Sequence, residues 1–379
     1  MTEKTTFDYI IIGGGLAGMQ LALAFCEDAF FAKKQIAIIE PEPKKDNDKT
    51  WCFWEKGTGK WDKLITHEWK NASFHGPKKS VELNLGEYSY KMLRSVDFYN
   101  FVKKELAKHA NITWVVDSVE GVTDQTVLGK KETYTAEFIF DSRTTQNFKD
   151  DDSSTTVLQP FKGWVIETED DQFNPSSFTF MDYRLGHNRN TCFTYVLPIS
   201  KRKALVEFTF FVPELIDNKI YDEKLKEFIQ GILNIESYSI HEVEEGIIPM
   251  SSFPFWCENR NGYHKIGTGG GWVKASTGYS FKNVERKVAE LIHTLKNNTL
   301  PKAGFWQNRF RFYDEVLLNI LSTKNEKGPE VFERMYLKNE AHKIFKFLDE
   351  ETTFAEELKI MWNTNRPLFV KSVIDLLKR

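Results

Sequence analysis

The opening of the chain carries the glycine-rich pattern that most restricts its fold. A β-branched run, Asp8–Ile12, leads into Gly-x-Gly-x-x-Gly at Gly13–Gly18, and an apolar segment typical of a helix follows over 16–25. A second apolar run, 35–39, ends in Glu40, 22 residues past the last glycine of the motif. Strand, helix, strand and acid in this order predict a Rossmann-type βαβ unit that binds a dinucleotide. We expect Glu40 to accept hydrogen bonds from ribose hydroxyls, which disfavours a 2′-phosphate.

Each part of the glycine motif has a role in holding a dinucleotide. Gly13 permits a tight turn, Gly15 lets the backbone approach the pyrophosphate, and Gly18 lets the helix pack closely on the strand. Leu16 and Ala17 lie in the first turn of the predicted helix. The free N–H groups and the positive end of that helix are expected to hold the phosphates.

Composition excludes several classes of function. The 379 residues carry a net charge of −3 with no basic run, so nucleic-acid binding is not expected. The four cysteines lie far apart without a Cys-x-x-Cys pair, which predicts reduced thiols and no metal site. We expect no signal peptide, because the chain enters the first strand at once, and no membrane span, because glycines interrupt its longest apolar stretch. These observations favour a cytoplasmic protein.

Aromatic residues are unusually frequent, at 14% of the chain, although the mean hydropathy is −0.44. Most of the rings are expected to fill the core. A minority would line a pocket for a large apolar substrate or cover a surface that rests on a membrane.

Further along the chain the predicted elements change in character. A helix that begins at Ser95 or Asp97, both good N-cap residues, and runs to Leu106 continues the nucleotide-binding part, as do strands over 111–116 and 134–140. The region 164–211 is rich in β-branched and aromatic residues and predicts an antiparallel sheet. Roughly the last 75 residues switch to helical periodicity.

A second glycine cluster supplies a further candidate ligand site. Its residues are Gly267, Thr268, Gly269 and Gly270, followed by Ser276, Thr277 and Gly278, which are expected to start a helix aimed at a ligand. A glycine-rich turn without a ligand is the alternative. The two clusters together resemble the split FAD site of glutathione-reductase-type flavoproteins. That resemblance implies FAD contacts at Arg94 and Arg143, for which an exposed surface arginine is the alternative.

The chain departs from the hydroxylase branch of those flavoproteins at two points. Gly267-Thr268 stands where many members have Gly-Asp, and 141–143 reads Asp-Ser-Arg where hydroxylases have Asp-Gly.

A narrower resemblance covers nearly the whole chain. Six segments, in the same order, resemble the lycopene beta-cyclases of carotenoid-making bacteria: 47–54, 181–184, 195–198, 205–209, 245–250 and 267–281. The resemblance implies an FAD enzyme that closes beta-ionone rings on acyclic carotenoids such as lycopene without net oxidation. It also implies that the flavin acts in its reduced form, with NADPH as the electron source. Because the substrate is soluble only in lipid, we expect peripheral attachment to the inner face of the cell membrane.

The resemblance makes Glu207 the candidate catalytic acid. Ring closure begins with protonation of an alkene, a very poor base, so the acid must be protonated and desolvated; burial raises the pKa of a carboxyl group. Glu207 stands in an apolar strand, although alternation places it on the face opposite Phe208, where solvent or an arginine is the alternative neighbour. Phe208 also replaces the second acid that family members often carry. Asp182 and Glu245 are secondary candidates, or ordinary ion-pair partners.

We therefore predict an α/β flavoprotein with a glutathione-reductase-like, Rossmann-type FAD-binding domain at 1–150 and 246–300. A mostly antiparallel substrate lobe is expected at 151–245 and a helical region at 301–379. Alternatives are a flavin monooxygenase or halogenase, a prenyl-chain reductase, and a non-enzymatic dinucleotide-binding module. The sequence leaves open the oligomeric state, the terminating base, and whether one or both substrate ends are cyclised.

Overall fold

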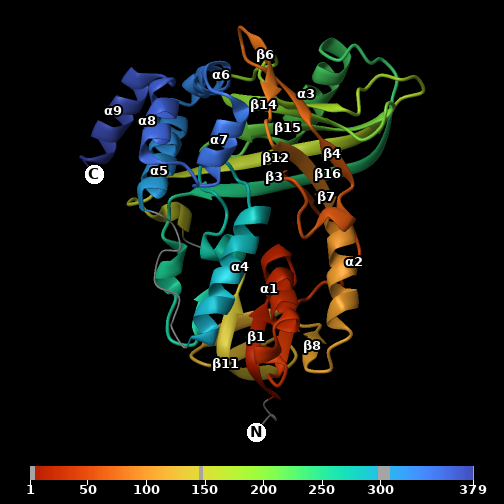
Figure 1. The fold of residues 1–379 in the computed structure, drawn as a ribbon, viewed down its shortest axis with the longest axis vertical. Helices are drawn as coiled ribbons and strands as arrows, with labels where there is room; N and C mark the ends of the chain where they lie inside the picture. Colours follow the sequence, from red (N-terminus) through yellow and green to blue (C-terminus); the bar gives the residue numbers. More distant parts are fainter. Residues whose placement is uncertain (1–4, 145–147, 298–307, 379) are drawn as a thin grey trace. The chain divides into compact units, whose positions relative to one another are not determined.

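The structure, a computed structural model, describes residues 5–144, 148–297 and 308–378 (Figure 1). Its contacts divide the chain into two compact units. Unit 1 comprises 1–51, 94–154 and 253–307, and unit 2 comprises 52–93, 155–252 and 308–379. The sequence placed 52–93 with the nucleotide-binding part and the C-terminal helices in a region of their own. In the structure both segments group with the middle of the chain, because they pair with or pack on the same sheet.

Unit 1 is built on a seven-stranded sheet with a parallel centre. The strand order is β8-β2-β1-β11-β10-β9, and β17 pairs with β11 beside this path. Strands β8, β2, β1, β11 and β17 pair parallel with one another, whereas β10 pairs antiparallel with both β11 and β9. The bounds are Thr5–Ile12 (β1), Ile36–Ile39 (β2), Ile112–Val115 (β8), Val119–Thr123 (β9), Thr126–Gly129 (β10), Thr133–Asp141 (β11) and Tyr263–Lys265 (β17).

Three helices of unit 1 lie side by side on this sheet (Figure 1). Helix α1, Leu16–Glu27, contacts both α2, Ser95–Leu106, and α4, Phe281–Lys296. Because α1 is covered by its neighbours as well as by the sheet, most of its side chains are buried and it is apolar nearly all round. The βαβ unit predicted from the glycine motif is thus confirmed.

The predicted helix start at Ser276–Gly278 is wrong. The N–H of Gly278 donates to the carbonyl of Lys274 at 2.9 Å, and Gly278 has a φ of +77°. That left-handed conformation closes a turn instead of continuing a helix, so α4 begins three residues later at Phe281.

Unit 2 contains the predicted antiparallel region as part of a larger seven-stranded sheet. The order is β16-β12-β15-β14-β13-β5-β6, and all pairs are antiparallel except β13 with β5. The bounds are Asn71–His75 (β5), Ser80–Asn84 (β6), Thr156–Glu167 (β12), Ser177–Asp182 (β13), Thr191–Pro198 (β14), Lys203–Phe211 (β15) and Ser239–Ser251 (β16). A three-stranded sheet, β3-β7-β4, adds Thr50–Lys56 (β3), His67–Trp69 (β4) and Tyr88–Arg94 (β7).

The helices of unit 2 cover this large sheet at different places. Helix α3, Asn218–Gly231, buries Tyr221, Leu225 and Phe228 against alternate residues of β15. The C-terminal helices are α5 (Asn308–Thr323), α6 (Gly328–Lys338), α7 (Ala341–Leu348), α8 (Phe354–Trp362) and α9 (Arg366–Leu376). Of these, α5 packs on β12 and α9 packs on α5. In the described part of the chain, every helix is too short or too polar to cross a membrane.

Candidate functional site

The first candidate site of the structure lies at the carboxyl edge of the parallel strands in unit 1. Ile12 at the end of β1 pairs with Ile39 and with Asp141, and Asp141 pairs with Lys265 at the end of β17. The residues that follow these strand ends therefore gather at one edge of the sheet. This is the edge at which open α/β sheets bind their ligands.

Gly13 and Gly18 take the structural roles predicted for them, and the pyrophosphate contact at Gly15 stays a prediction. Gly13 has a φ of +97°, which side chains disfavour, and a methyl group built on it would lie 2.1 Å from the Oγ of Ser142. A methyl group on Gly18 would lie 1.9 Å from the carbonyl oxygen of Gly13, so only glycine lets α1 approach β1 this closely. A methyl group on Gly15 would meet no atom within 4 Å. Gly15 thus leaves the space that a pyrophosphate requires.

The N-terminus of α1 faces the same edge without a capping side chain. Gly15 is the N-cap residue, and the first turn holds no acidic residue. Leu16 and Ala17 are the first helical residues, and the first N–H groups of a helix have no acceptor within it. These donors and the positive end of the helix suit a phosphate group.

Glu40 also lies at this edge, and it is bound to the glycine turn. Its Oε2 accepts the N–H of Gly14 at 2.7 Å, and its Oε1 accepts the N–H of Glu42 at 3.0 Å. A carboxylate offers about four acceptor positions, so these bonds leave capacity for ribose hydroxyls. The predicted ribose contact stays a prediction.

The second glycine cluster packs against the first one. Residues Gly267–Gly270 form a 3-10 turn after β17, which includes Thr268. A methyl group on Gly267 would lie 2.9 Å from the Cβ of Ala17, and one on Gly269 would lie 2.2 Å from the carbonyl oxygen of Arg143. A methyl group on Gly270 would similarly lie 2.4 Å from the carbonyl oxygen of Lys265. The two glycine clusters, far apart in sequence, thus form one close-packed backbone surface.

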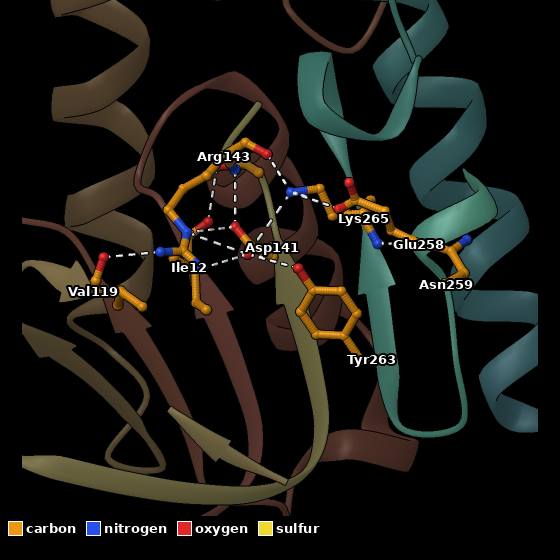
Figure 2. Close-up of polar contacts among 9 residues, drawn as sticks. Ile12, Val119, Asp141, Arg143, Glu258, Asn259, Tyr263 and Lys265 are labelled. Carbon is orange, nitrogen blue, oxygen red and sulfur yellow. Dashed lines mark hydrogen bonds and ion pairs between the residues drawn. The ribbon is translucent and has the colours of Figure 1, made fainter. Parts of the chain in front are cut away.

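The two arginines predicted to contact FAD have different surroundings. Figure 2 shows Arg143 bound to Asp141. The Nη2 of Arg143 donates to Oδ2 of Asp141 at 2.7 Å, and the Nη1 of Arg143 donates to the carbonyl of Val119 at 2.8 Å. Tyr263 donates its hydroxyl to Asp141 at 2.9 Å. Arg94 is half-buried at the N-cap of α2. Arg143 is half-buried and ion-paired, and both FAD contacts stay predictions.

Asp141 forms the centre of this buried polar cluster. Burial raises its pKa, but hydrogen bonds from Arg143 and the charge of Lys265 outweigh that effect and hold the pKa of Asp141 below its usual value. Lys265 itself is buried, and its Nζ contacts the carbonyl oxygen of Arg143 (Figure 2). The cluster ties the end of β11 to β17 and so fixes the edge from which both glycine clusters project.

A second candidate site lies in unit 2, around Glu207 on β15. Val206, Phe208 and Phe210 alternate into the core beneath α3, so Glu207 and Thr209 point to the opposite face of the sheet. The hydroxyl of Thr209 donates to Oε1 of Glu207 at 3.0 Å. Burial raises the pKa of Glu207 well above its usual range, and the nearby charge of Glu244 raises it further. This carboxyl group therefore suits a proton donor.

Aromatic rings surround this face of the sheet. Tyr195 lies opposite Glu207 in the pairing of β14 with β15, and its ring centroid is 5.1 Å from that of Phe193 and 6.0 Å from that of Phe180. The ring of Tyr90 on β7 lies 6.0 Å from that of Phe180. Aromatic faces attract cations, so this environment suits a positively charged intermediate.

The secondary acids do not join Glu207. Glu245 pairs with Lys162, whose other neighbour in register is Phe208, so Glu245 is exposed on the opposite face of the sheet. Asp182 is fully buried and binds Arg184, with a 2.6 Å bond from Nη2 to its Oδ2. The ion-pair alternative therefore describes Asp182, and the predicted proton relay through these two residues has no geometric support.

Sequence reasoning missed the acid that does lie beside Glu207. Glu244 pairs with Gly163 on β12, and Gly163 pairs with Glu207 on β15. In the structure, 242, 244, 246 and 248 of β16 are less exposed than the residues between them. The sequence has acids at 242, 244 and 245, so which of them lies beside Glu207 depends on a strand register that the sequence does not fix.

Comparisons with solved structures support the fold. A geranylgeranyl bacteriochlorophyll reductase-like protein from Thermoplasma acidophilum is similar over 99% of this chain and 100% of its own, with a TM-score of 0.63 and 15% identity. The flavin-dependent brominase Bmp2 is similar over 99% of this chain and 100% of its own, with a TM-score of 0.58 and 13% identity. The halogenase PltM is similar over 96% of this chain and 85% of its own, with a TM-score of 0.54 and 13% identity. At such low identity these likenesses show the fold alone.

Two further comparisons concern the sequence. A search of the curated proteins found no match to this chain. The sequence model of one family, described as lycopene cyclase protein, matches residues 8–377. That match spans both units, including the glycine motif and Glu207, so this chain belongs to the lycopene cyclase family.

Proposed function

We propose that this protein is a lycopene beta-cyclase that binds FAD. The observation that carries the proposal is Glu207, a carboxyl group with a raised pKa on an aromatic-lined face of the sheet. In a chain of the lycopene cyclase family, such a group has the chemistry that alkene protonation requires.

FAD would be held in unit 1 by the residues at the carboxyl edge of the sheet. The open space beside Gly15 and the uncapped first turn of α1 fit a pyrophosphate. Glu40 has acceptor capacity for a ribose, and the turn at Gly267–Gly270 offers closely packed backbone to the rest of the cofactor. A bound, reduced flavin supplies an electron-rich ring that stabilises positive charge, with NADPH as the proposed source of its electrons.

The reaction needs one proton and no net change in oxidation state. The carboxyl group of Glu207 donates its proton to C2 of the terminal alkene, which leaves a tertiary cation at C1. The C5=C6 double bond then attacks C1 and closes the ring. Loss of the proton at C6 ends the reaction, so the product has the formula of the substrate. The aromatic rings around Tyr195 would stabilise the cation between these steps.

The direct test is to incubate purified protein under anaerobic conditions with FAD, NADPH and lycopene in liposomes made up in D₂O. Ring-containing products of unchanged hydrogen count that carry solvent deuterium support the proposal. Products with two added hydrogens would instead indicate a reductase. Intact lycopene with oxygen-dependent consumption of NADPH would indicate a monooxygenase or halogenase.

The matched control uses two glutamates of the same sheet. Glu207→Gln removes the donor proton and should reduce cyclisation at least 100-fold, on the order of what general acid catalysis contributes. Glu245→Gln changes an exposed residue of the opposite face and should leave the rate within about twofold. Equal losses in the two variants would refute the role of Glu207.

We also propose that the C-terminal helices attach the protein to the membrane that contains its substrate. Three large apolar side chains of α8 are exposed at four-residue spacing, at Phe354, Leu358 and Trp362, the last one 63% exposed. Helix α9 adds Val370 and Ile374 on its exposed side. Exposed Trp, Phe and Leu on one helix face are typical of interfacial helices.

Vesicle flotation tests this attachment. The double variant Leu358→Glu and Trp362→Glu should lose most of its binding to vesicles, because two charges would enter the lipid interface. Val116→Glu changes an equally exposed apolar residue of unit 1 and serves as the control. Equal flotation of both variants would refute the proposed surface.

A further inference from the structure

Two glutamates of unit 2 meet across a glycine. In the large sheet, Gly163 on the middle strand β12 is in register with Glu207 on one side and with Glu244 on the other. Residues directly opposite one another in antiparallel strands point to the same face. The two acidic side chains therefore rise from the same face of the sheet, with no side chain between them.

The absent side chain of Gly163 is what lets the carboxyl groups approach. A methyl group built on Gly163 would lie 3.3 Å from Cβ and 3.4 Å from Cγ of Glu207, and 2.9 Å from a methyl carbon of Leu205. Strands two places apart are separated by about 9–10 Å, a distance that two glutamate side chains can bridge over an empty position. Both the charge of Glu244 and a side-chain hydrogen bond with it contribute to the raised pKa of Glu207. Because a carboxylate has no hydrogen to donate, such a bond requires one of the two groups to hold a proton.

Several other described groups lie near this pair. Thr209 donates a hydroxyl to Glu207, and Tyr195 lies opposite in register. From β3, Cys52 approaches both acids, and it is hydrogen-bonded to Tyr90 of β7. Burial and the two acids raise the pKa of the Cys52 thiol well above its usual value, so it remains uncharged. A hydroxyl, a thiol and an aromatic group are thus among the neighbours of the pair.

We propose that Glu244 is a positioning residue that holds the transferable proton on Glu207, with Gly163 as the spacer that brings the two carboxyl groups together. Burial and the negative charge of Glu244 both disfavour ionisation of Glu207. After Glu207 gives up its proton, two adjacent carboxylates repel each other, which favours rapid reprotonation. This inference rests on the proposed function for its catalytic meaning, but the shared proton exists independently of any substrate.

Infrared titration of the substrate-free, full-length protein tests the shared proton directly. The carbonyl band of a protonated carboxyl group should persist to a pH well above the usual range of a glutamate and disappear in Glu207→Gln. In Glu244→Gln the neighbouring charge is gone, and the titration midpoint of the band should fall by at least about one pH unit. Glu244→Asp keeps the charge and should restore most of the midpoint. Glu245→Gln, on the opposite face, should leave the midpoint unchanged.

Gly163→Ala provides a second, independent perturbation, since its methyl group separates the pair without changing any charge. It should shift the midpoint in the same direction as Glu244→Gln. If neither variant moves the midpoint by more than about 0.3 pH units, the inference is overturned. If Gly163→Ala does not fold, the comparison of Glu244→Gln with Glu244→Asp still decides the result.

The pH profile of cyclisation separates this inference from the proposed function. The alkaline limb of the rate should move to lower pH in Glu244→Gln, together with the infrared midpoint. A shifted infrared midpoint in a protein that does not cyclise lycopene would support the carboxyl pair and refute the proposed function. Normal cyclisation by Glu244→Gln, with an unchanged infrared midpoint and an unchanged alkaline limb, would support the proposed function and refute the carboxyl pair.

Discussion

The close contact between α1 and β1 gives the sharpest test of the glycine motif. In Gly18→Ala the new methyl group would lie 1.9 Å from the carbonyl oxygen of Gly13 and 3.1 Å from Cγ2 of Ile11. Overpacking destabilises a protein by about 1–3 kcal/mol, and because the clashing neighbour is rigid backbone we expect a cost of about 3 kcal/mol here. Alanine is more favourable than glycine within a helix, which offsets about 1 kcal/mol of that cost. We therefore expect unit 1 to lose about 2 kcal/mol of stability.

Gly15→Ala is the matched variant, because the same methyl group meets no protein atom within 4 Å. Gly15 has a φ of −83°, which alanine adopts readily, so the stability of the flavin-free protein should change by less than about 1 kcal/mol. The methyl group would instead occupy the space assigned to the pyrophosphate. FAD binding should weaken at least tenfold, equivalent to about 1.4 kcal/mol.

The two variants are compared by hydrogen exchange of the β1 and β11 amides in flavin-free protein, which reports the stability of unit 1 itself. FAD affinity is measured by titration followed through flavin fluorescence. The reasoning predicts opposite effects: Gly18→Ala accelerates exchange, and Gly15→Ala mainly weakens binding. Unchanged exchange in Gly18→Ala would refute the packing argument, and unchanged affinity in Gly15→Ala would refute the assigned phosphate position.

Three further predictions follow from individual side chains. Burial lowers the pKa of His264 to about 4 in the folded protein. As the pH drops, this histidine is therefore protonated in the unfolded chain before it is protonated in the folded one. The free energy of unfolding should fall by up to about 3 kcal/mol between about pH 6.5 and pH 4. His264→Phe should flatten that dependence in denaturation curves at pH 7 and 4.5, and an equally steep loss would contradict the assignment. Burial raises the pKa of the Cys192 thiol to about 12, so a thiol reagent at pH 8 should label the exposed Cys257 quickly and Cys192 only after unfolding; labelling at equal rates would be inconsistent with the fold. Asp182→Asn should cost about 1–3 kcal/mol through its weakened bonds to Arg184 yet leave cyclisation intact, whereas lost activity at unchanged stability would assign Asp182 to catalysis.

The parts of the fold that the sequence predicted depend on local backbone rules. Gly13 and Gly18 were assigned by spacing alone, and the structure gives them a left-handed turn and a close helix–strand contact. Helix α2 begins at Ser95, one of the two predicted starts, but its N-cap residue is Arg94 rather than the predicted Ser95 or Asp97. The alternation along β15 correctly placed Glu207 opposite Phe208, because the period of a strand is fixed by its geometry.

Local sequence rules failed at the second glycine cluster, where the backbone conformation of one residue decides whether the residues after it are helical. Ser276–Gly278 carries residues typical of a helix start, but the left-handed conformation of Gly278 closes a turn first. The FAD contact at Arg143, which the flavoprotein resemblance implies, stays a prediction. The structure adds that the acid two residues earlier binds its guanidinium group.

Which acid stands beside Glu207 was decided only by tertiary structure. Glu244 and Glu245 are neighbours in sequence, and a shift of one residue in the register of β16 would exchange their faces. The sequence by itself determined a βαβ unit with a glycine-rich turn and an acid on one face of a strand, because both follow from periods and spacings within a short segment. The pairing of Glu207 with Glu244 across Gly163 joins three segments far apart in the chain, and only the register of the folded sheet brings them together.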